Sequence, residues 1–271
     1  MSEPINITDI KDNGIVYSIC TFVTRFDQYK AAVNSFVDLG FSYHDCEYIY
    51  IDNSDKNQYD AYRGINKFLT TANGKYIIIC HQDVLLVDDG REKLDAVLGE
   101  LGRIDPSWGV CGNGGGMYPG RLALRVTDPH GDSQFTEPLP QKVSGLDENF
   151  LVVRRDANLA VSADLKGFHL YGTDICIMAR VLGYTAYVVD FHLRHLSSGA
   201  SKYESRGFAE LRAALIAKYR RVMRPRTATT TTTAVYLGGS AAVSPVLNAV
   251  LATSIPKRLG RLPKMLGLKR Q

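Results

Sequence analysis

The sequence predicts an α/β fold in which a mostly parallel sheet is flanked by helices, with a basic C-terminal helical extension. Strand-like runs alternate with helical patterns through most of the chain, as in doubly wound folds. Several of the strand-like runs are apolar on both faces, which is typical of strands covered from two sides. From Leu211 to the C-terminus there are twelve Lys and Arg residues and no Asp or Glu, so the end of the chain differs in character.

The expected strands are short runs rich in β-branched and aromatic residues. They cover 14–23, 46–53, 75–80, 108–112 and 184–193. Helical patterns follow the first three of them, at 25–40, 58–72 and 91–101, and the first helix ends at Gly40. In sheets of this kind ligands bind outside the carboxyl ends of the strands, so a site is expected at that edge.

Composition and charge place the chain among ordinary globular proteins. Its 271 residues are 45% hydrophobic and 22% charged, which suits one large domain with an appendage. Five scattered cysteines without a CxxC pair favour a reducing compartment, and the N-terminus lacks a secretory pattern, so we expect a cytoplasmic protein. Residues 1–210 hold 20 basic and 28 acidic residues, so an acidic body carries the basic tail.

Polar side chains stand at the ends of the first three expected strands. His81, Gln82 and Asp83 follow the third strand, Asp52 and Asn53 follow the second, and Thr21 ends the first. These residues should converge on one crevice. A carboxylate such as Asp83 suits a hard divalent cation, which would in turn bridge phosphates.

The middle of the chain, 112–150, is dense in Gly and Pro, and we expect loops over the edge of the sheet. GNGGG within it could form a phosphate cradle, but no GK[ST] follows, so a flexible loop is the favoured interpretation.

Two further segments carry candidate residues for chemistry. A helix stripe ending at Gly183 places Thr173 or Asp174 at a helix N-terminus, where an Asp is either a cap or an ionised general base. In DFHLRHLSSG, His192 and His195 are three apart and point to opposite faces of an extended segment, so they should not share one ion. His195 is the better candidate for an open site.

Several of these segments resemble one known family. ANGKYIIICHQDV resembles the end of the nucleotide-binding half of GT-A (Rossmann-like) glycosyltransferases of the bacterial family-two type, where an apolar strand ends in a D-x-D motif. Asn66 matches the asparagine of that family's preceding helix, and IYIDNS is similar to its second-strand tip. GFHLYGTDICIMARVLGY resembles the acceptor-side helix, and HLRHLSSG the segment in which some members supply a metal-binding histidine.

The resemblance spans about residues 14 to 200 and implies an activity. It implies an inverting, metal-dependent hexosyltransferase that takes a sugar from a nucleoside diphosphate sugar, most of all a UDP-sugar. The implied acceptor is a hydroxyl of a glycan or lipid-linked glycan in surface polysaccharide assembly. The implied residues are Asp174 as catalytic base, Asp83 and His195 as metal ligands, and Thr21, Asp52, Asn53, Arg63, Asn66, His81 and Gln82 around the nucleotide sugar. Two domains are expected, a catalytic domain at 1–222 and an appendage at 223–271. Within the catalytic domain, the nucleotide-binding half covers 14–112 and the acceptor half covers 113–222.

The sequence departs from the family at His81, which stands where the first Asp of D-x-D is expected. One carboxylate then holds the Mn²⁺ or Mg²⁺ cofactor unless His81 or His195 helps, and a histidine ligand shifts the preference toward Mn²⁺.

The appendage is expected to hold a threonine-rich linker and a basic amphipathic tail. From Thr227 to Pro256 there is no charged residue, and basic residues follow. This pattern is typical of a segment lying on the inner face of a membrane, and equally of a tail that docks on its own catalytic domain or on a partner subunit. A transmembrane span is the third alternative. Nucleic acid is not an expected partner, because the basic residues lack interleaved aromatic residues.

Two rival functions stay open from the sequence. One is a zinc hydrolase built on His81, Asp83, His192 and His195, although the chain lacks a close-spaced ligand pair such as HExxH. The other is a catalytically silent protein that binds sugar nucleotides, which the His81 departure suggests.

Overall fold

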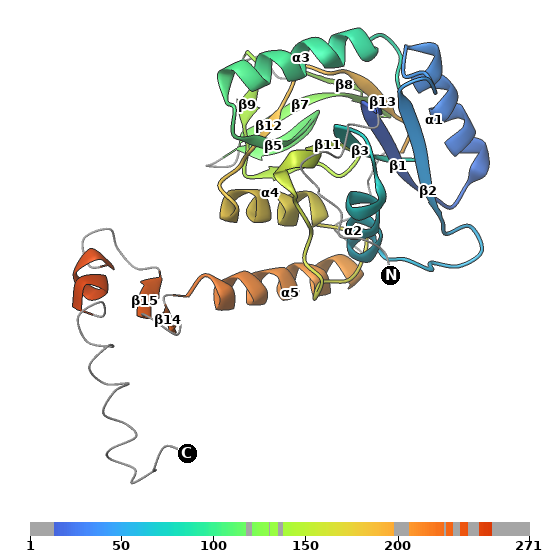
Figure 1. Cartoon of the computed structure of the whole chain (residues 1–271). Coiled ribbons are helices and arrows are strands. Elements are labelled where there is room, and N and C mark those ends of the chain that lie inside the picture. Colours follow the sequence, from blue (N-terminus) through green and yellow to red (C-terminus); the bar gives the residue numbers. More distant parts are fainter. Residues whose placement is uncertain are drawn as a thin grey trace, which may run out of the picture. The chain divides into compact units, whose positions relative to one another are not determined.

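A seven-stranded sheet forms the centre of the first of two units, in the order β2-β1-β3-β11-β5-β12-β9 (Figure 1). Its strands are β1 (Tyr17–Val23), β2 (Cys46–Asp52), β3 (Tyr76–His81), β5 (Trp108–Gly112), β9 (Gln141–Lys142), β11 (Phe150–Arg154) and β12 (Thr185–Val188). β1 pairs in parallel with β2 and β3, and β5 pairs in parallel with β12. β11 lies antiparallel between β3 and β5, so β1, β2, β3, β5 and β12 all run in the same direction. The predicted mostly parallel sheet is therefore confirmed.

The computed structural model describes residues 14–117, 121–129, 131–134, 138–197, 206–224, 226–229, 234–237 and 244–250. The two compact units of the chain are Met1–Arg212 and Ala213–Gln271.

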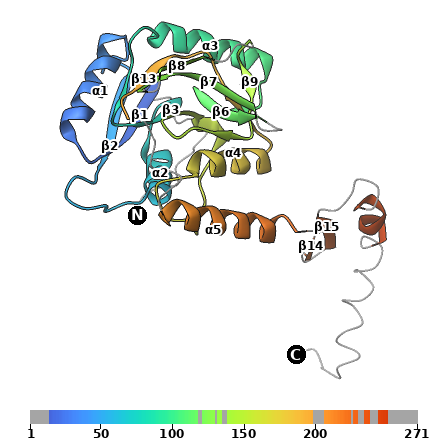
Figure 2. The same ribbon diagram turned by 180° about the vertical axis from the view of Figure 1, so that it is seen from behind.

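Helices cover both faces of the large sheet (Figures 1 and 2). α1 (Phe26–Asp38) and α3 (Arg91–Ile104) lie on one face, and α2 (Ala61–Thr71) and α4 (Tyr171–Val181) lie on the other. Phe36 of α1 and Leu98 of α3 belong to one buried cluster with Ile78 of β3 and Val152 of β11. The apolar stripes of these helices therefore pack on the sheet as their sequence patterns predict.

Four of the six strands of a second sheet come from the region that we predicted as loops, so that prediction is wrong. Its order is β10-β6-β7-β13-β4, with β8 pairing β7. The strands are β4 (Val84–Leu85), β6 (Gly114–Met117), β7 (Arg121–Asp128), β8 (Gly131–Gln134), β10 (Gly145–Leu146) and β13 (Leu193–His195). GNGGG is not a flexible loop, because Gly112 ends β5 and Gly114, Gly115 and Gly116 begin β6. A Cβ on Gly115 would lie 2.7 Å from the carbonyl oxygen of Gly145, so close strand approach explains the glycine.

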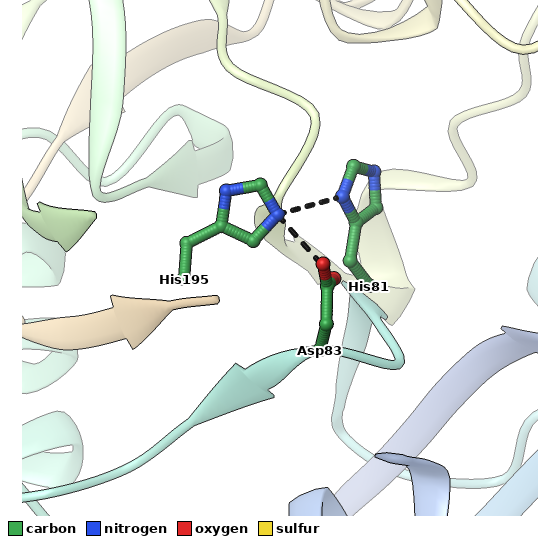
Figure 3. Close-up of side chains that lie close together, drawn as sticks. All are labelled: His81, Asp83 and His195. Atoms are coloured by element: carbon green, nitrogen blue, oxygen red, sulfur yellow. Dashed lines mark hydrogen bonds and ion pairs between the residues drawn. The ribbon is translucent and has the colours of Figure 1, made fainter. Parts of the chain in front are cut away.

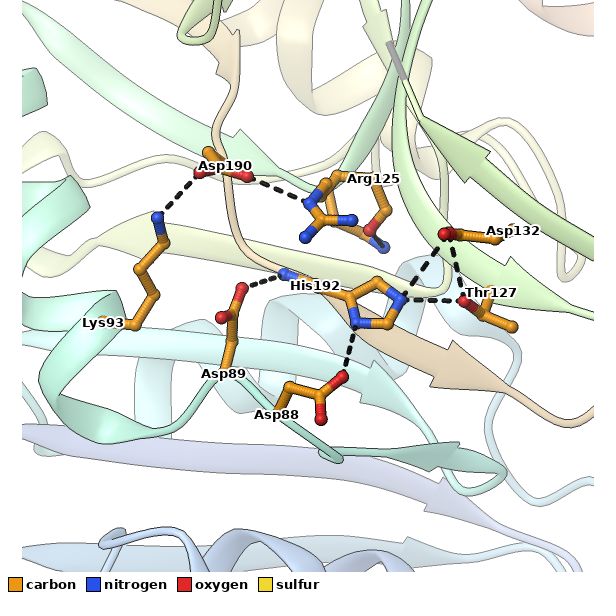
Figure 4. A network of polar contacts seen from close by, with 9 residues as sticks. Asp88, Asp89, Lys93, Arg125, Thr127, Asp132, Asp190 and His192 are labelled. Carbon is orange, nitrogen blue, oxygen red and sulfur yellow. Dashed lines mark hydrogen bonds and ion pairs between the residues drawn. The ribbon is translucent and has the colours of Figure 1, made fainter.

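The run 184–193, predicted as one strand, is divided between the two sheets. β12 ends at Val188 and β13 begins at Leu193. Between them Asp190 accepts a hydrogen bond from Lys93 Nζ at 2.7 Å and from Arg125 Nε at 3.0 Å (Figure 4). These two ion pairs hold the chain where it leaves one sheet for the other.

The second unit begins inside helix α5 (Arg206–Val222) and includes an antiparallel strand pair, β14 (Arg226–Thr229) and β15 (Ala234–Leu237). Part of the stretch predicted as a linker is thus a strand pair, in keeping with the strand preference of β-branched threonine. Residues 244–250 are helical. Among the described residues no helix is long and apolar enough to cross a membrane. The most basic part of the predicted tail, 251–271, lies outside the described residues.

Two glycines in helix interiors should respond oppositely to alanine. A Cβ on Gly64 in α2 would overlap the ring of Phe22, which is confined by Phe68 and Phe168, whereas a Cβ on Gly99 in α3 would have no other atom within 4 Å. We expect Gly99→Ala to raise the free energy of unfolding by about 0.5–1 kcal/mol, since it removes backbone entropy from the unfolded chain.

Gly64→Ala should lower the free energy of unfolding by about 1–3 kcal/mol, because the clash costs more than the helix propensity gains. Urea unfolding of both variants measures the difference. Equal stabilisation by both alanines would mean that α2 does not press on Phe22 in solution.

Candidate functional site

The pairing of two short strands brings together three residues that are far apart in sequence. β3 ends at His81, and β4 starts directly after Asp83. β4 runs antiparallel to β13, with His195 opposite Val84, and the Leu196 amide donates a hydrogen bond to the Asp83 carbonyl at 2.9 Å. His81, Asp83 and His195 consequently lie side by side (Figure 3).

The three side chains form a cluster with the dimensions of a metal centre. One donor atom of each lies within 4.8 Å of the others. His195 Nε2 is 3.3 Å from Asp83 Oδ1 and 3.3 Å from His81 Nδ1, and the Ser197 hydroxyl lies 3.2 Å from the same nitrogen. His195 is buried, with 7% of its surface exposed, whereas His81 and Asp83 are half-buried, so the cluster can be reached from the solvent side.

The environment of Asp83 keeps its carboxylate charged. Burial by itself would raise the pKa of Asp83, but the hydrogen bond and charge of His195, with smaller contributions from His81 and Ser197, outweigh it and lower the pKa to about 2. Two imidazoles and one ionised carboxylate are a donor set suited to a divalent transition metal, more so than to Mg²⁺, which prefers oxygen ligands. The residues present therefore fit the predicted cation.

A cavity of about 190 Å³ opens beside the cluster at the carboxyl ends of β1, β2 and β3. It is lined by Phe22, Thr24, Asn53, Ile79, Cys80, His81, Gln82, Asp83, Phe168 and Tyr171. The expected convergence of strand tips on one crevice is therefore seen for Asn53, His81, Gln82 and Asp83.

Four other predicted nucleotide-sugar residues do not line this cavity. Thr21 does not end its strand, because β1 continues to Val23. The Thr21 side chain is buried, and its hydroxyl lies 3.5 Å from the Cys80 sulfur. Thr24, which follows the strand directly, lines the cavity instead. Asn66 binds the main chain of Val161 through both ends of its carboxamide, at 2.9 Å each, which is a structural contact.

Asp52 and Arg63 are exposed near the site without entering it. The Asp52 carboxylate accepts hydrogen bonds from the amide and hydroxyl of Ser54, at 2.9 and 2.6 Å, and closes the turn after β2. The Arg63 guanidinium stacks over the Tyr59 ring at 4.9 Å. Their predicted roles in binding the nucleotide stay predictions.

Gln82 lines the cavity but also has a structural role. Its Oε1 accepts hydrogen bonds from the amides of Thr24 and Arg25, both at 2.8 Å, and its Nε2 donates to the Thr24 hydroxyl at 2.8 Å. The middle residue of the HQD run therefore joins the tip of β3 to the start of α1. A glutamine amide can serve these donors and this acceptor together, which a carboxylate could not.

Asp174 lies in the first turn of α4 and is completely buried. Its carboxylate accepts hydrogen bonds from the Ser162 amide and from the Ser162 hydroxyl, both at 2.7 Å. The N-cap position itself is taken by Leu170, so Asp174 is not the helix cap. A base must reach the acceptor hydroxyl. The catalytic role predicted for Asp174 thus stays a prediction that requires the Ser162 contact to open.

His192 does not belong to the His81–Asp83–His195 cluster, in line with the expectation that it and His195 face apart. Its Nε2 lies 2.8 Å from the Thr127 hydroxyl and its amide donates to Asp89 at 2.6 Å (Figure 4). Asp88 and Asp132 lie 3.7 and 3.9 Å from its two ring nitrogens. The four-residue zinc site of the rival hydrolase is therefore reduced to three residues.

Tyr171 and two phenylalanines are site residues that the sequence reasoning missed. Phe22 and Phe168 form the apolar wall of the cavity, and the Tyr171 hydroxyl contacts His81. Phe22 directly follows Thr21 in the first strand, and Tyr171 precedes Asp174 by three residues. Both are therefore close in sequence to residues that the sequence analysis named as candidates.

The fold of the protein is that of known glycosyltransferases. The mannosyltransferase PcManGT of Pyrobaculum calidifontis, solved with GDP-Man and Mn²⁺, is similar with a TM-score of 0.52 at 11% identity, over 94% of this chain and 76% of that one. Residues 1–349 of S. aureus TarS, solved with UDP-GlcNAc, are similar with a TM-score of 0.50 at 11% identity, over 75% of this chain and 66% of that one. The predicted GT-A-like α/β class is confirmed.

The chain belongs to the family of a curated protein from Fuscovulum blasticum, the ATP synthase subunits region ORF 6. The two are 34% identical over 242 residues, which are 87% of this chain and 96% of the relative. The name of that relative gives a gene region and no activity. No family model matches the sequence.

The buried contact between Asp174 and Ser162 predicts a loss of stability in Asp174→Asn. The asparagine keeps one acceptor but presents an amide to a donor, so the free energy of unfolding should fall by about 1–3 kcal/mol. Chemical denaturation measures this loss. A variant as stable as the wild type that had lost sugar transfer would instead support the catalytic role.

Proposed function

We propose that this protein is a metal-dependent glycosyltransferase that moves a sugar from a nucleoside diphosphate sugar to a hydroxyl group. The observation that carries the proposal is the His81–Asp83–His195 cluster beside a cavity at the carboxyl ends of three parallel strands. The fold shared with PcManGT and TarS supports it, since those proteins were solved with GDP-Man and UDP-GlcNAc.

The cation would be held by His81 Nδ1, the Asp83 carboxylate and His195 Nε2. Manganese is the ion we propose, because the donor set holds two imidazoles, and the Mn²⁺ bound to PcManGT is consistent with it. When bound, a divalent cation offsets the negative charge that develops on a departing diphosphate. The low pKa of Asp83 ensures that the carboxylate needs no deprotonation to take part.

The chain's own residues would orient the donor. Gln82 fixes the tip of β3 against α1, so that the cluster and the cavity keep one geometry. The Asn53 carboxamide is bound to the main chain of Tyr59 and holds the turn after β2, where we propose that the nucleotide base lies. Phe22 and Phe168 give the cavity an apolar wall.

We further propose that the transfer inverts the anomeric centre, with Asp174 as the base after release from Ser162. Inversion follows from attack on the face opposite the leaving diphosphate, the same stereochemical logic that governs glycosidases. The acceptor would be a glycan or lipid-linked glycan of surface polysaccharide, reached at the inner face of the membrane through the basic C-terminal tail. The charge division between an acidic body and a basic tail supports this last point.

Zinc hydrolysis is the second candidate, because three protein ligands are the usual number at a catalytic zinc ion. Metal analysis after dialysis separates the two: retained zinc supports the hydrolase, and weakly held Mn²⁺ supports the transferase.

Removal of a cluster residue should strongly weaken metal binding without unfolding the protein. In His195→Ala and Asp83→Asn we expect Mn²⁺ affinity to fall at least about 100-fold, since even loss of an outer-shell partner costs about 10–100-fold. Isothermal titration with Mn²⁺ measures this. Release of GDP from GDP-mannose, UDP from UDP-GlcNAc and dTDP from dTDP-glucose, each with Mn²⁺, should fall in parallel.

His44→Ala is the matched control, because His44 is an exposed histidine outside the cluster. It should bind Mn²⁺ and turn over the donor like the wild type. If the wild type binds a sugar nucleotide but releases no diphosphate from any donor with a range of glycan acceptors, the protein is a silent sugar-nucleotide binder and the proposed activity is wrong.

The membrane proposal predicts that the C-terminal region governs flotation with liposomes. Full-length protein should float with vesicles that contain anionic lipid, and a variant that ends near Arg226 should not, because most of the uncompensated basic charge beyond the helix is removed. Vesicles of neutral lipid are the control. Equal flotation of both proteins would assign membrane contact to another part of the chain or to none.

A further inference from the structure

Tyr171 is a buried residue that connects the metal cluster to the main chain. It begins α4, lines the cavity and is 3% exposed. Its hydroxyl lies 3.1 Å from His81 Nε2 and 3.1 Å from the carbonyl oxygen of Glu148.

These two contacts determine which nitrogen of His81 carries a hydrogen. A carbonyl oxygen can only accept, so the tyrosine hydroxyl donates its single hydrogen to Glu148. The hydroxyl oxygen then accepts from His81, whose Nε2 must be the donor. A neutral imidazole with its hydrogen on Nε2 has a lone pair on Nδ1, the atom that lies 3.3 Å from His195 Nε2.

We propose that Tyr171 is a positioning residue that fixes His81 in the Nε2–H tautomer and so aims the Nδ1 lone pair at the cation site. The proposal rests on the proposed function, because it takes the cluster to be a metal centre. Histidine ligands generally donate their second ring N–H to a carboxylate, a carbonyl or water, which fixes the tautomer and the ring orientation. Here a tyrosine hydroxyl relays that contact to a main-chain carbonyl.

The first turn of α4 holds Tyr171 in place for this role. Asp174, three residues later, is bound by Ser162 through two contacts of 2.7 Å. Leu170, directly before Tyr171, has a left-handed backbone with φ 62°, so the chain turns sharply into the helix. The buried Asp174 carboxylate thereby fixes the turn from which Tyr171 reaches His81.

The test compares Tyr171→Phe with the wild type in two measurements. The ring nitrogens of His81 are observed by ¹⁵N NMR in metal-free protein, with His81→Gln identifying the signals by their loss. We expect a protonated Nε2 and an unprotonated Nδ1 in the wild type, and shifts toward a mixture of tautomers in Tyr171→Phe. Titration with Mn²⁺ should then show about 10–100-fold weaker binding in the variant.

Tyr48→Phe is the matched control, because Tyr48 also donates its hydroxyl to a main-chain carbonyl, that of Phe41 at 2.7 Å, outside the cluster. It should leave the His81 shifts and the Mn²⁺ affinity unchanged. A general loss of packing would weaken Mn²⁺ binding in both variants alike, and that result overturns the proposal.

The tautomer is read without metal, so two failures can be told apart. A hydrogen on His81 Nδ1 in a wild-type protein that binds Mn²⁺ overturns the role of Tyr171 alone. A wild-type protein that binds no Mn²⁺ overturns the metal centre and this role with it.

Discussion

The antiparallel pairing of β4 with β13 is the interaction on which the site depends. Each strand is only two or three residues long, yet the pair sets His195 opposite Val84 and therefore beside Asp83. A shift of one residue in this register would turn the histidine to the other face of the sheet. β13 is itself held by β7 on its other side and by the His192 and Asp190 contacts that precede it. The polar network around Asp190 and His192 (Figure 4) therefore stabilises the His81–Asp83–His195 cluster (Figure 3), although these two residues are not part of the cluster.

The site is assembled from groups that would be unfavourable to bury one by one. An ionised carboxylate in this setting is tolerable because His195 and Ser197 offer hydrogen-bond donors, and the low pKa of Asp83 is the measure of how far they compensate for burial. The histidines are restrained in turn, His81 by Tyr171 and His195 by Ser197. Such restraint is what a metal ligand requires, since a preformed set of donors loses little entropy when the ion binds.

The sequence predicted the elements of this fold better than their junctions. Strands such as 46–53 and 108–112 and the helix at 91–101 have clear periodicity, and the structure has them within a few residues. The second sheet was missed because most of its strands are only two to four residues long, and because β6, with the sequence GGGM, has the composition of a loop. Asp83 and His195 could be proposed from their places after strands. The contact of Tyr171 with His81, by contrast, depends on where α4 packs, which no local pattern encodes.

The size of the cavity constrains how a sugar nucleotide can bind. At about 190 Å³ it is smaller than the roughly 300–1,000 Å³ typical of pockets that enclose a ligand. The space beside His81 and Asp83 is therefore suited to one part of a donor, and on the proposed function that part is the diphosphate end next to the cation. The base would then lie outside the cavity, over the turn that Asp52 and Asn53 hold after β2. Asp52 is exposed on that turn and, on the proposed function, would lie beside the base, although it does not line the cavity.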